Sequence, residues 1–89
     1  MHSHPTLRDA ELRALAERYH REAEAYDRTV CTGPILDGAI MPATPREMRL
    51  VQVNANKLRE LIVMEGVLNG FSRAEILRAI RHDVKRDRG

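Results

Sequence analysis

Apolar positions in the first third of the chain recur at helical spacing. After Leu7, each lies three or four residues from another, as a helical stripe requires, at Leu7, Leu12, Leu15, Ala16, Tyr19, Ala23, Tyr26 and Val30. Mostly polar and charged residues fill the positions between them. The pattern therefore predicts a first helix running roughly from Leu7 to Val30.

Residues typical of a helix N-terminus predict where a second helix begins. Thr44-Pro45-Arg46-Glu47 combines a capping threonine, a proline at the first helical position and a glutamate three residues after the cap. Asn69-Gly70 supplies a stop, because glycine adopts the left-handed conformation that ends many helices. These signals predict a long helix between residues 45 and 68.

A third helix opens with the same kind of signal. Ser72-Arg73-Ala74-Glu75 is a second capping box, and Phe71, just before it, is placed to contact Ile76 one turn into the helix. The apolar face of this helix is predicted at Ile76, Leu77, Ile80 and Val84. The whole chain therefore reads as all-α, with two long helices and a shorter third.

Two regions carry more apolar residues than a chain of 89 residues can bury by itself. The segment 32–43 is broken by Gly and Pro, yet it contains Ile35, Leu36, Ile40 and Met41. The second helix has one apolar stripe at Met48, Val51, Ala55, Leu58 and Ile62, and another beside it at Leu50, Val53, Leu61, Met64 and Leu68. We expect the segment 32–43 to be an apolar loop and the chain to form a homo-oligomer.

Composition narrows the class of protein. Residues 1–89 make a single domain, of which 1–5 are expected to be disordered. The net charge is only +2, so a general polyanion binder is not implied, although 13 of the 15 cationic residues are arginine, which favours bidentate contacts with phosphate or carboxylate. With a single cysteine, Cys31, and no signal or membrane-spanning segment, we expect a cytoplasmic protein.

Catalytic and metal-binding patterns are weak. Serine occurs only at Ser3 and Ser72, no elbow surrounds Cys31, and we expect this thiol to be buried or half-buried. His2 and His4 form an isolated H-x-H without further ligand spacing. No glycine-rich phosphate-binding motif is present. The expectation is a protein that is not an enzyme and has no metal or cofactor.

The stretch Tyr19–Pro34 is the strongest candidate binding segment. Tyr19 and Tyr26, seven residues apart, share a helical face and are two of only three aromatic residues in the chain. Arg28, Thr29 and Thr32 follow closely and can contact phosphate or hydroxyl groups. An aromatic platform beside such groups is typical of nucleotide binding, whereas tyrosines at helical spacing are also common as partly buried core residues.

A DNA-binding role is the alternative of a different class. The second helix, the turn at Asn69-Gly70-Phe71 and the third helix can imitate a helix-turn-helix, with basic residues at Arg73, Arg78, Arg81, Lys85 and Arg86. The second helix is long and apolar for that motif, and overall charge is nearly balanced. A solvated basic face is favoured over DNA contact, and a structural helical interaction module is a third alternative.

Three pieces of sequence resemble a known family. They are Y-H-x-x-x-x-x-Y-D-R-T-V-C-T-G-P from Tyr19, G-x-x-M-P-A-T-x-x-E-M from Gly38, and Asn54-Ala55-Asn56. Together they resemble small phage proteins that act as cyclic-oligonucleotide sponges against the CBASS bacterial defence system, over roughly residues 15–70. The resemblance implies an all-helical hexamer that sequesters cyclic di- or trinucleotides between subunits, without cleaving them, in the host-cell cytoplasm.

The resemblance also implies roles for residues of this chain. Tyr19, with its neighbour His20, is the preferred base-stacking tyrosine, and Tyr26 is the alternative. The family's phosphate-contacting lysine has no counterpart, because no lysine precedes Lys57, and Arg28 would have to substitute. Thr29 or Thr32 would supply a hydroxyl and Arg73 the family's arginine. The missing lysine leaves the ligand preference open.

Overall fold

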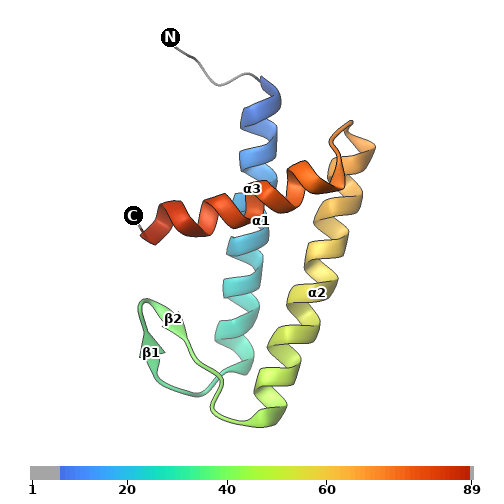
Figure 1. Ribbon diagram of the computed structural model, residues 1–89. Coiled ribbons are helices and arrows are strands. Elements are labelled where there is room, and N and C mark those ends of the chain that lie inside the picture. Colours follow the sequence, from blue (N-terminus) through green and yellow to red (C-terminus); the bar gives the residue numbers. More distant parts are fainter. Residues whose placement is uncertain (1–6, 89) are drawn as a thin grey trace.

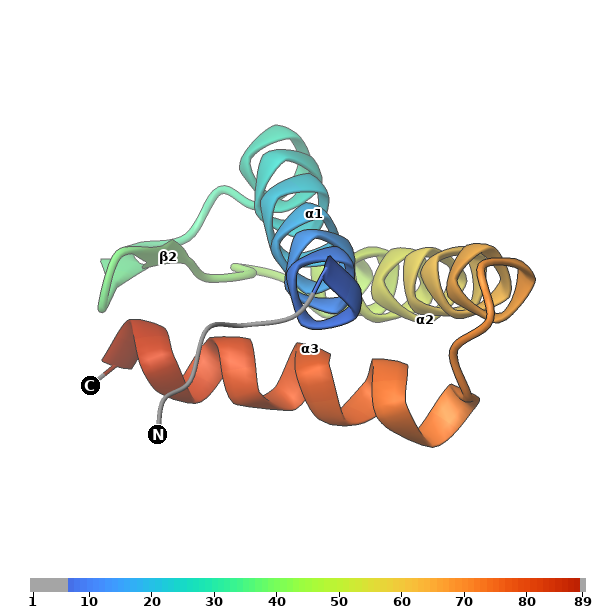
Figure 2. The ribbon, with the colours of Figure 1, turned by 90° about the horizontal axis from the view of Figure 1, so that it is seen from above.

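Three helices and a small hairpin make up the part of the chain that the computed structural model describes, which is the backbone of residues 7–88 and the side chains of residues 7–82. The elements are α1 (Leu7–Val30), β1 (Ile35–Leu36), β2 (Ala39–Ile40), α2 (Pro45–Leu68) and α3 (Arg73–Arg88). α1 and α2 lie side by side, and α3 crosses α1 (Figures 1 and 2). The mostly helical architecture confirms the predicted fold class. The expected disorder of residues 1–5, the H-x-H histidines and the side chains of Val84, Lys85 and Arg86 lie outside the described residues.

The helix ends follow the predicted signals. At the start of α2 the hydroxyl of Thr44 accepts a hydrogen bond from the Glu47 amide at 3.1 Å, and Pro45 occupies the first helical position. At its end, Phe71 N–H donates to the Gly66 carbonyl and Gly70 N–H to the Val67 carbonyl, each at 3.0 Å. This is a Schellman motif, and the φ of +97° at Gly70 is the left-handed conformation that it requires.

The second capping box forms completely. Ser72 Oγ accepts from the Glu75 amide at 3.1 Å, and a Glu75 carboxylate oxygen accepts from the Ser72 amide at 3.0 Å. Phe71 and Ile76 are both buried in the same cluster, as the predicted contact between them requires. These bonds fix the turn between α2 and α3 and therefore the direction in which α3 leaves it.

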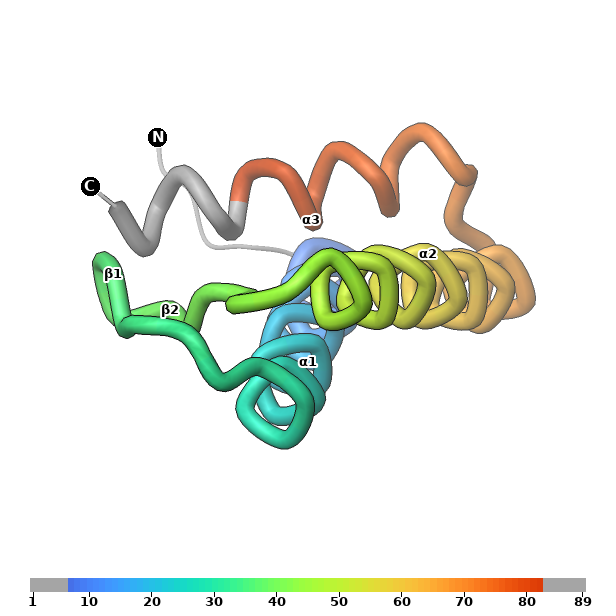
Figure 3. The backbone as a smooth tube through the Cα atoms, turned by 90° about the horizontal axis from the view of Figure 1, so that it is seen from below, coloured from blue at the N-terminus to red at the C-terminus, as the bar shows by residue number. Residues whose placement is uncertain are grey.

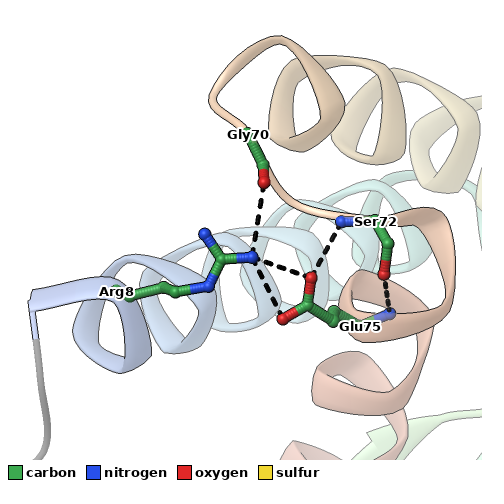
Figure 4. Close-up of polar contacts among 4 residues, drawn as sticks. All are labelled: Arg8, Gly70, Ser72 and Glu75. Atoms are coloured by element: carbon green, nitrogen blue, oxygen red, sulfur yellow. Dashed lines mark hydrogen bonds and ion pairs between the residues drawn. The ribbon is translucent and has the colours of Figure 1, made fainter.

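A feature that the sequence pattern missed fastens this turn to α1. Arg8 on α1 donates to both carboxylate oxygens of Glu75, at 2.8 and 3.2 Å, and to the Gly70 carbonyl at 3.3 Å (Figure 4). Its guanidinium carbon also lies 4.4 Å from the centre of the Phe71 ring. Arg8 thus connects the beginning of the chain to a turn more than sixty residues later.

The core lies where the three helices meet. Its buried members come from α1, from α2 and from α3 with the turn before it: Leu15, Ala16, Ile62, Val63, Phe71, Ile76 and Ile80. Gly66 is buried among them, and the surrounding side chains leave no room for a larger residue at this position. A Cβ on Gly66 would lie 2.4 Å from Ile76 Cδ1 and 3.2 Å from Leu15 Cδ1. Gly66 therefore permits the close approach of α2 to α3 and α1.

The expected loop 32–43 contains a two-stranded hairpin, which corrects the prediction. Ile35 pairs with Ile40 and Leu36 with Ala39, around a turn at Asp37 and Gly38 whose φ angles are +52° and +81°. Two positive φ angles are typical of the type I′ turn, for which Asp-Gly is a preferred sequence. The Asp-Gly pair between apolar residues was the available signal.

The hairpin stays largely uncovered. It extends sideways from the lower end of α1 and α2 (Figure 3), and the exposed fractions of Ile35, Leu36 and Met41 are 69%, 55% and 39%. Only β2 contacts α1. Within one chain, the apolar segment therefore does not fold back onto the core.

The two apolar stripes of α2 differ in how far they are buried. Val51, Ala55, Leu58 and Ile62 are partly or fully buried, whereas Met48, at the start of that stripe, is exposed. The second stripe is exposed along its length, at Leu50, Val53, Leu61, Met64 and Leu68. The wide band predicted from sequence is thus covered on one side only.

Candidate functional site

The strongest candidate site is a cavity of about 610 Å³ to which all three helices contribute. It is lined by residues of α1, α2 and α3: Tyr19, His20, Arg59, Arg73, Leu77, Ile80 and Arg81. Its volume falls within the range of small-molecule sites. Three guanidinium groups, two aromatic rings and an apolar floor therefore meet in one place. We call it the arginine cavity.

The two rings on α1 are held firmly. Tyr19 is half-buried and packs against the core, while its remaining surface lines the arginine cavity. The His20 ring lies edge-on to it, with ring centres 5.1 Å apart and an angle of 79° between the planes. His20 Nε2–H donates to the Ile80 carbonyl at 2.8 Å, which ties α1 to α3. His20 therefore has a structural role in addition to its place in the cavity wall.

Arg73 enters the cavity already paired with a carboxylate. It donates to both oxygens of Glu60, at 3.0 and 2.8 Å, in a bidentate contact between α3 and α2. Hydrogen bonding to Glu60 raises the pKa of Arg73, and the same bonds from Arg73 hold the pKa of Glu60 below its usual range. An anion in the cavity would share Arg73 with Glu60.

The other two arginines make no salt bridge with a carboxylate among the described residues, although the charge of Arg59 also lowers the pKa of Glu60. Arg59 donates to the Asn56 side-chain oxygen at 3.0 Å, and Arg81 is exposed on α3. Both guanidinium groups can accordingly turn toward an anion without breaking an ion pair. The cavity carries a net positive charge, because Glu60 offsets only one of its three cations.

The remaining predicted site residues lie elsewhere. Tyr26, Arg28, Thr29 and Thr32 are at the hairpin end of α1, and none of them lines the arginine cavity. Arg28 is nine residues beyond Tyr19, which corresponds to about 13 Å of helix. One chain therefore brings Tyr19, His20 and Arg73 together and leaves the other four in a separate group.

Three of the four side chains in that second group, those of Arg28, Thr29 and Thr32, already have an internal contact. Arg28 pairs with Glu24, and the Thr29 hydroxyl donates to the Tyr26 carbonyl at 2.6 Å. Thr32 donates to the Glu47 carboxylate through its amide, at 3.0 Å, and through its hydroxyl, at 2.9 Å. These contacts organise the junction between α1 and the hairpin.

Cys31 lies at the same junction and is 5% exposed. Burial raises the pKa of its thiol, and the nearby carboxylates of Asp27 and Glu47 act in the same direction. A raised pKa opposes formation of the nucleophilic thiolate. The expectation of a buried thiol is confirmed.

Sequence reasoning did not assign Arg59 to the site, and it considered Arg81 only for DNA. Arg73, Leu77, Ile80 and Arg81 recur at i, i+4, i+7 and i+8, so one face of α3 was a usable signal. The place of Arg59 in the site could not be predicted from sequence, since it depends on the angle at which α3 crosses the other helices.

The described residues contain neither a metal-binding cluster nor a membrane-spanning helix. No group of three His, Cys, Asp or Glu side chains within the described residues is arranged to hold a metal ion. In the same part of the chain, no helix is both long and apolar enough to cross a membrane. No family model, curated protein or solved structure matches this chain.

Proposed function

We propose that the protein binds a cyclic di- or trinucleotide in the arginine cavity and sequesters it without cleavage, in the host-cell cytoplasm, thereby withdrawing a CBASS defence signal from its effector. The observation that carries this proposal is the meeting of the Tyr19 ring with Arg59, Arg73 and Arg81 in one cavity. Self-assembly into a homo-oligomer, a hexamer by family resemblance, is part of the proposal.

The chemistry of the cavity suits a phosphate-bearing ring with bases attached. Guanidinium groups donate two parallel hydrogen bonds to phosphate oxygens, and Arg59 and Arg81 make no salt bridge with a carboxylate among the described residues. The exposed part of Tyr19 offers a surface for a base, and Leu77 with Ile80 offers apolar contact. Of the described lining residues, none is a carboxylate, serine or cysteine, and the Nε2 of the one histidine, His20, is bonded to the Ile80 carbonyl, which favours binding over hydrolysis.

The decisive experiment compares two arginines of α3. Arg81 lines the arginine cavity and Arg78 does not, while both are exposed. Calorimetric titration with cyclic di- and trinucleotides should show that Arg81→Ala weakens binding about tenfold, equivalent to ~1.4 kcal/mol, and flattens its salt dependence. Arg78→Ala should leave the affinity unchanged.

The same pair of variants tests the DNA-binding alternative. A helix that contacts DNA phosphates through its exposed face should lose affinity for duplex DNA in both variants, with a smaller salt slope in each. Binding of long DNA with this pattern, and no binding of cyclic nucleotides, would replace the proposal. Absence of both activities would leave the structural interaction module.

Tyr19 needs a variant that separates stacking from packing, because the ring contacts the core. Tyr19→Phe keeps the ring and should bind nearly as well as wild type. Tyr19→Ala should weaken binding about tenfold or more, since base stacking on an aromatic ring is worth roughly 1–3 kcal/mol. Affinity is measured only on variants whose circular dichroism and mass match the wild type. A folded Tyr19→Ala oligomer of unchanged affinity removes Tyr19 from the site.

The effect of Arg28→Ala on affinity tests whether the ligand spans two subunits. A ligand held by the cavity of one chain should be indifferent to Arg28→Ala, because Arg28 lies outside that cavity. A loss of affinity in a folded Arg28→Ala variant would place the hairpin end of a second subunit beside the cavity. In either case, chromatography of the recovered ligand should show it intact.

A further inference from the structure

The outer face of α2 is an apolar surface that none of the described residues covers. It consists of Leu50, Val53, Leu61, Met64, Val67 and Leu68, with Lys57 at its middle, and we call it the α2 stripe. Exposed fractions of its apolar members range from 37% for Leu50 to 83% for Leu68. It runs along about 27 Å of helix, and its members lie outside the buried core cluster. A continuous exposed surface of this kind marks an interaction site.

The spacing along the stripe is nearly symmetric about its centre. Measured from the midpoint between residues 58 and 59, Leu50 and Val67 lie 8.5 positions away on opposite sides, and Lys57 and Glu60 lie 1.5 away. Val53 and Met64 lie 5.5 positions away on opposite sides. A stripe that reads almost the same in both directions is complementary to its own copy turned around, as a two-fold interface requires.

The charges on the stripe select the antiparallel direction. Lys57 makes no ion pair with another described residue, and Glu60 lies one turn further along the same edge. Two parallel copies would place Lys57 against Lys57 of the partner subunit. Two antiparallel copies centred between residues 58 and 59 place Lys57 against Glu60 of the partner subunit, twice. Glu60 can accept this contact besides Arg73, because a carboxylate offers about four lone-pair sites.

A shallow hollow lies at the centre of the stripe. Its volume is about 440 Å³, and it is lined by Asn56, Lys57, Glu60, Leu61 and Met64. An apolar side chain from an opposing helix can enter such a hollow, in the manner of ridges packing into grooves. The middle of the stripe therefore has the relief of a helix-packing surface as well as its chemistry.

We propose that α2 pairs with α2 of a second copy through the α2 stripe, antiparallel about a two-fold axis near residues 58 and 59, with Lys57 facing Glu60 of the partner subunit. The inference rests on the proposed function only in sharing its expectation of self-assembly. It does not depend on which ligand the arginine cavity binds.

The first test uses two aspartate variants on one helix. Leu61 and Met48 have nearly equal exposed fractions, 60% and 59%, but only Leu61 belongs to the stripe. Leu61→Asp should raise the dissociation constant of the pair at least ~100-fold by sedimentation or light scattering, because the charge enters the interface twice. Met48→Asp should keep a mass of two subunits or more.

The second test uses charge reversals that only a facing chain can compensate, although Glu60→Lys also removes the Arg73 contact within its own chain. Lys57→Glu and Glu60→Lys should each weaken the pair, since each places like charges together. Mixing the two variants should restore a heterodimer, because both facing pairs are then attractive. A contact within one chain cannot be rescued by mixing. Circular dichroism first confirms that each variant is folded.

Three outcomes would overturn the pairing: a monomeric wild type, a Leu61→Asp variant of wild-type mass, or charge variants that mixing fails to rescue. Titration with cyclic nucleotides distinguishes this failure from failure of the proposed function. A wild-type monomer that binds ligand overturns the α2 pairing and the proposed assembly but leaves ligand sequestration standing. An intact α2 pair that binds no cyclic nucleotide supports the pairing and overturns the function.

Discussion

A single hydrogen atom in place of a side chain decides how closely the helices approach. Gly66 lies in the middle of α2's last turns, where glycine is normally unfavourable because it loses more backbone freedom than alanine on folding. Here the space that a methyl group would need is occupied by Ile76 and Leu15. The helix accepts the poorer helix former because the core requires it.

Gly66→Ala should therefore lower the free energy of unfolding, by about 1–3 kcal/mol, because overpacking a close contact outweighs the helix preference of alanine. Urea denaturation followed by circular dichroism measures it. Gln52→Ala, at an exposed position of the same helix, should stay within about 0.5 kcal/mol of wild type. Equal or greater stability of Gly66→Ala would show that Ile76 moves aside at little cost.

The roles of single residues could be predicted from sequence where they depend only on near neighbours in the chain. The caps at Thr44 and Ser72 and the left-handed Gly70 involve neighbours three to five residues apart, so their types and spacing suffice. The partners of Arg8 and Arg18 could not be predicted from sequence. Arg8 bonds Glu75, and Arg18 donates to the Glu65 carboxylate at 2.7 and 2.9 Å, across 67 and 47 residues of chain. Such partners are known only once the helix packing is known.

At the scale of elements, one carboxylate joins α1, the hairpin and α2. Glu47 was predicted to return to the cap residue, but its oxygens accept instead from the amides of Thr32 and Ala43, at 3.0 and 2.8 Å, and from the Thr32 hydroxyl. The amide of Ala43, then the amide and hydroxyl of Thr32, hold the pKa of Glu47 below its usual range. The ends of the segment 32–43 are thus joined through a single ionised group.

This lowered pKa makes the junction sensitive to acid. Because the folded state favours the ionised form, the stabilisation is complete above the unfolded pKa, which is about 4.3 for glutamate, and is lost as pH falls through the lower folded pKa. Glu47→Gln should be less stable than wild type near neutral pH, and the difference should shrink progressively below about pH 4. Urea unfolding at a series of pH values measures both.

Glu17→Gln is the matched control for that series. Glu17 is exposed on α1 and makes no hydrogen bond or ion pair with another described residue. Its substitution should leave the pH dependence of stability as in wild type. A Glu47→Gln variant that keeps the full wild-type pH dependence would show that other groups, among them Glu60 and Glu75 with their lowered pKa values, carry the acid sensitivity.

The helices were predictable as elements because each has its own periodicity and end signals. The hairpin was not assigned, since its strands are only two residues long and alternation has no room to show. Of the candidate site, Tyr19 and Arg73 were identified and do meet in the arginine cavity. Arg28 was expected beside Tyr19, but position along one helix separates them within a single chain.

At the scale of the whole molecule, the chain is more extended than its length requires. Its radius of gyration is 14.6 Å, whereas a compact chain of this length has about 12 Å. Two apolar surfaces remain open, the α2 stripe and the hairpin. A two-fold contact through α2 alone closes at a dimer, so the proposed hexamer requires a second contact, for which the hairpin is the candidate.

Met41→Asp should therefore break the larger assembly, because a charge buried at the hairpin contact costs several kcal/mol, on the scale of an unpaired buried ion. Ile40→Asp should act in the same way. Leu7→Asp, at an 85% exposed position on the first turn of α1, should leave the mass unchanged. Light scattering at micromolar concentration reports all three. A well-folded wild-type monomer would refute the assembly.

The crossing of α3 over α1 has a consequence for biosynthesis. Ile76 and Ile80 close the core that α1 and α2 leave open, so the packing of the first two helices stays incomplete until α3 has been made. Twelve further residues separate Leu68 from Ile80, roughly 0.6–2.4 s of translation at 5–20 residues per second. Until α3 has been made and packs, the apolar positions that it covers stay open in addition to the α2 stripe.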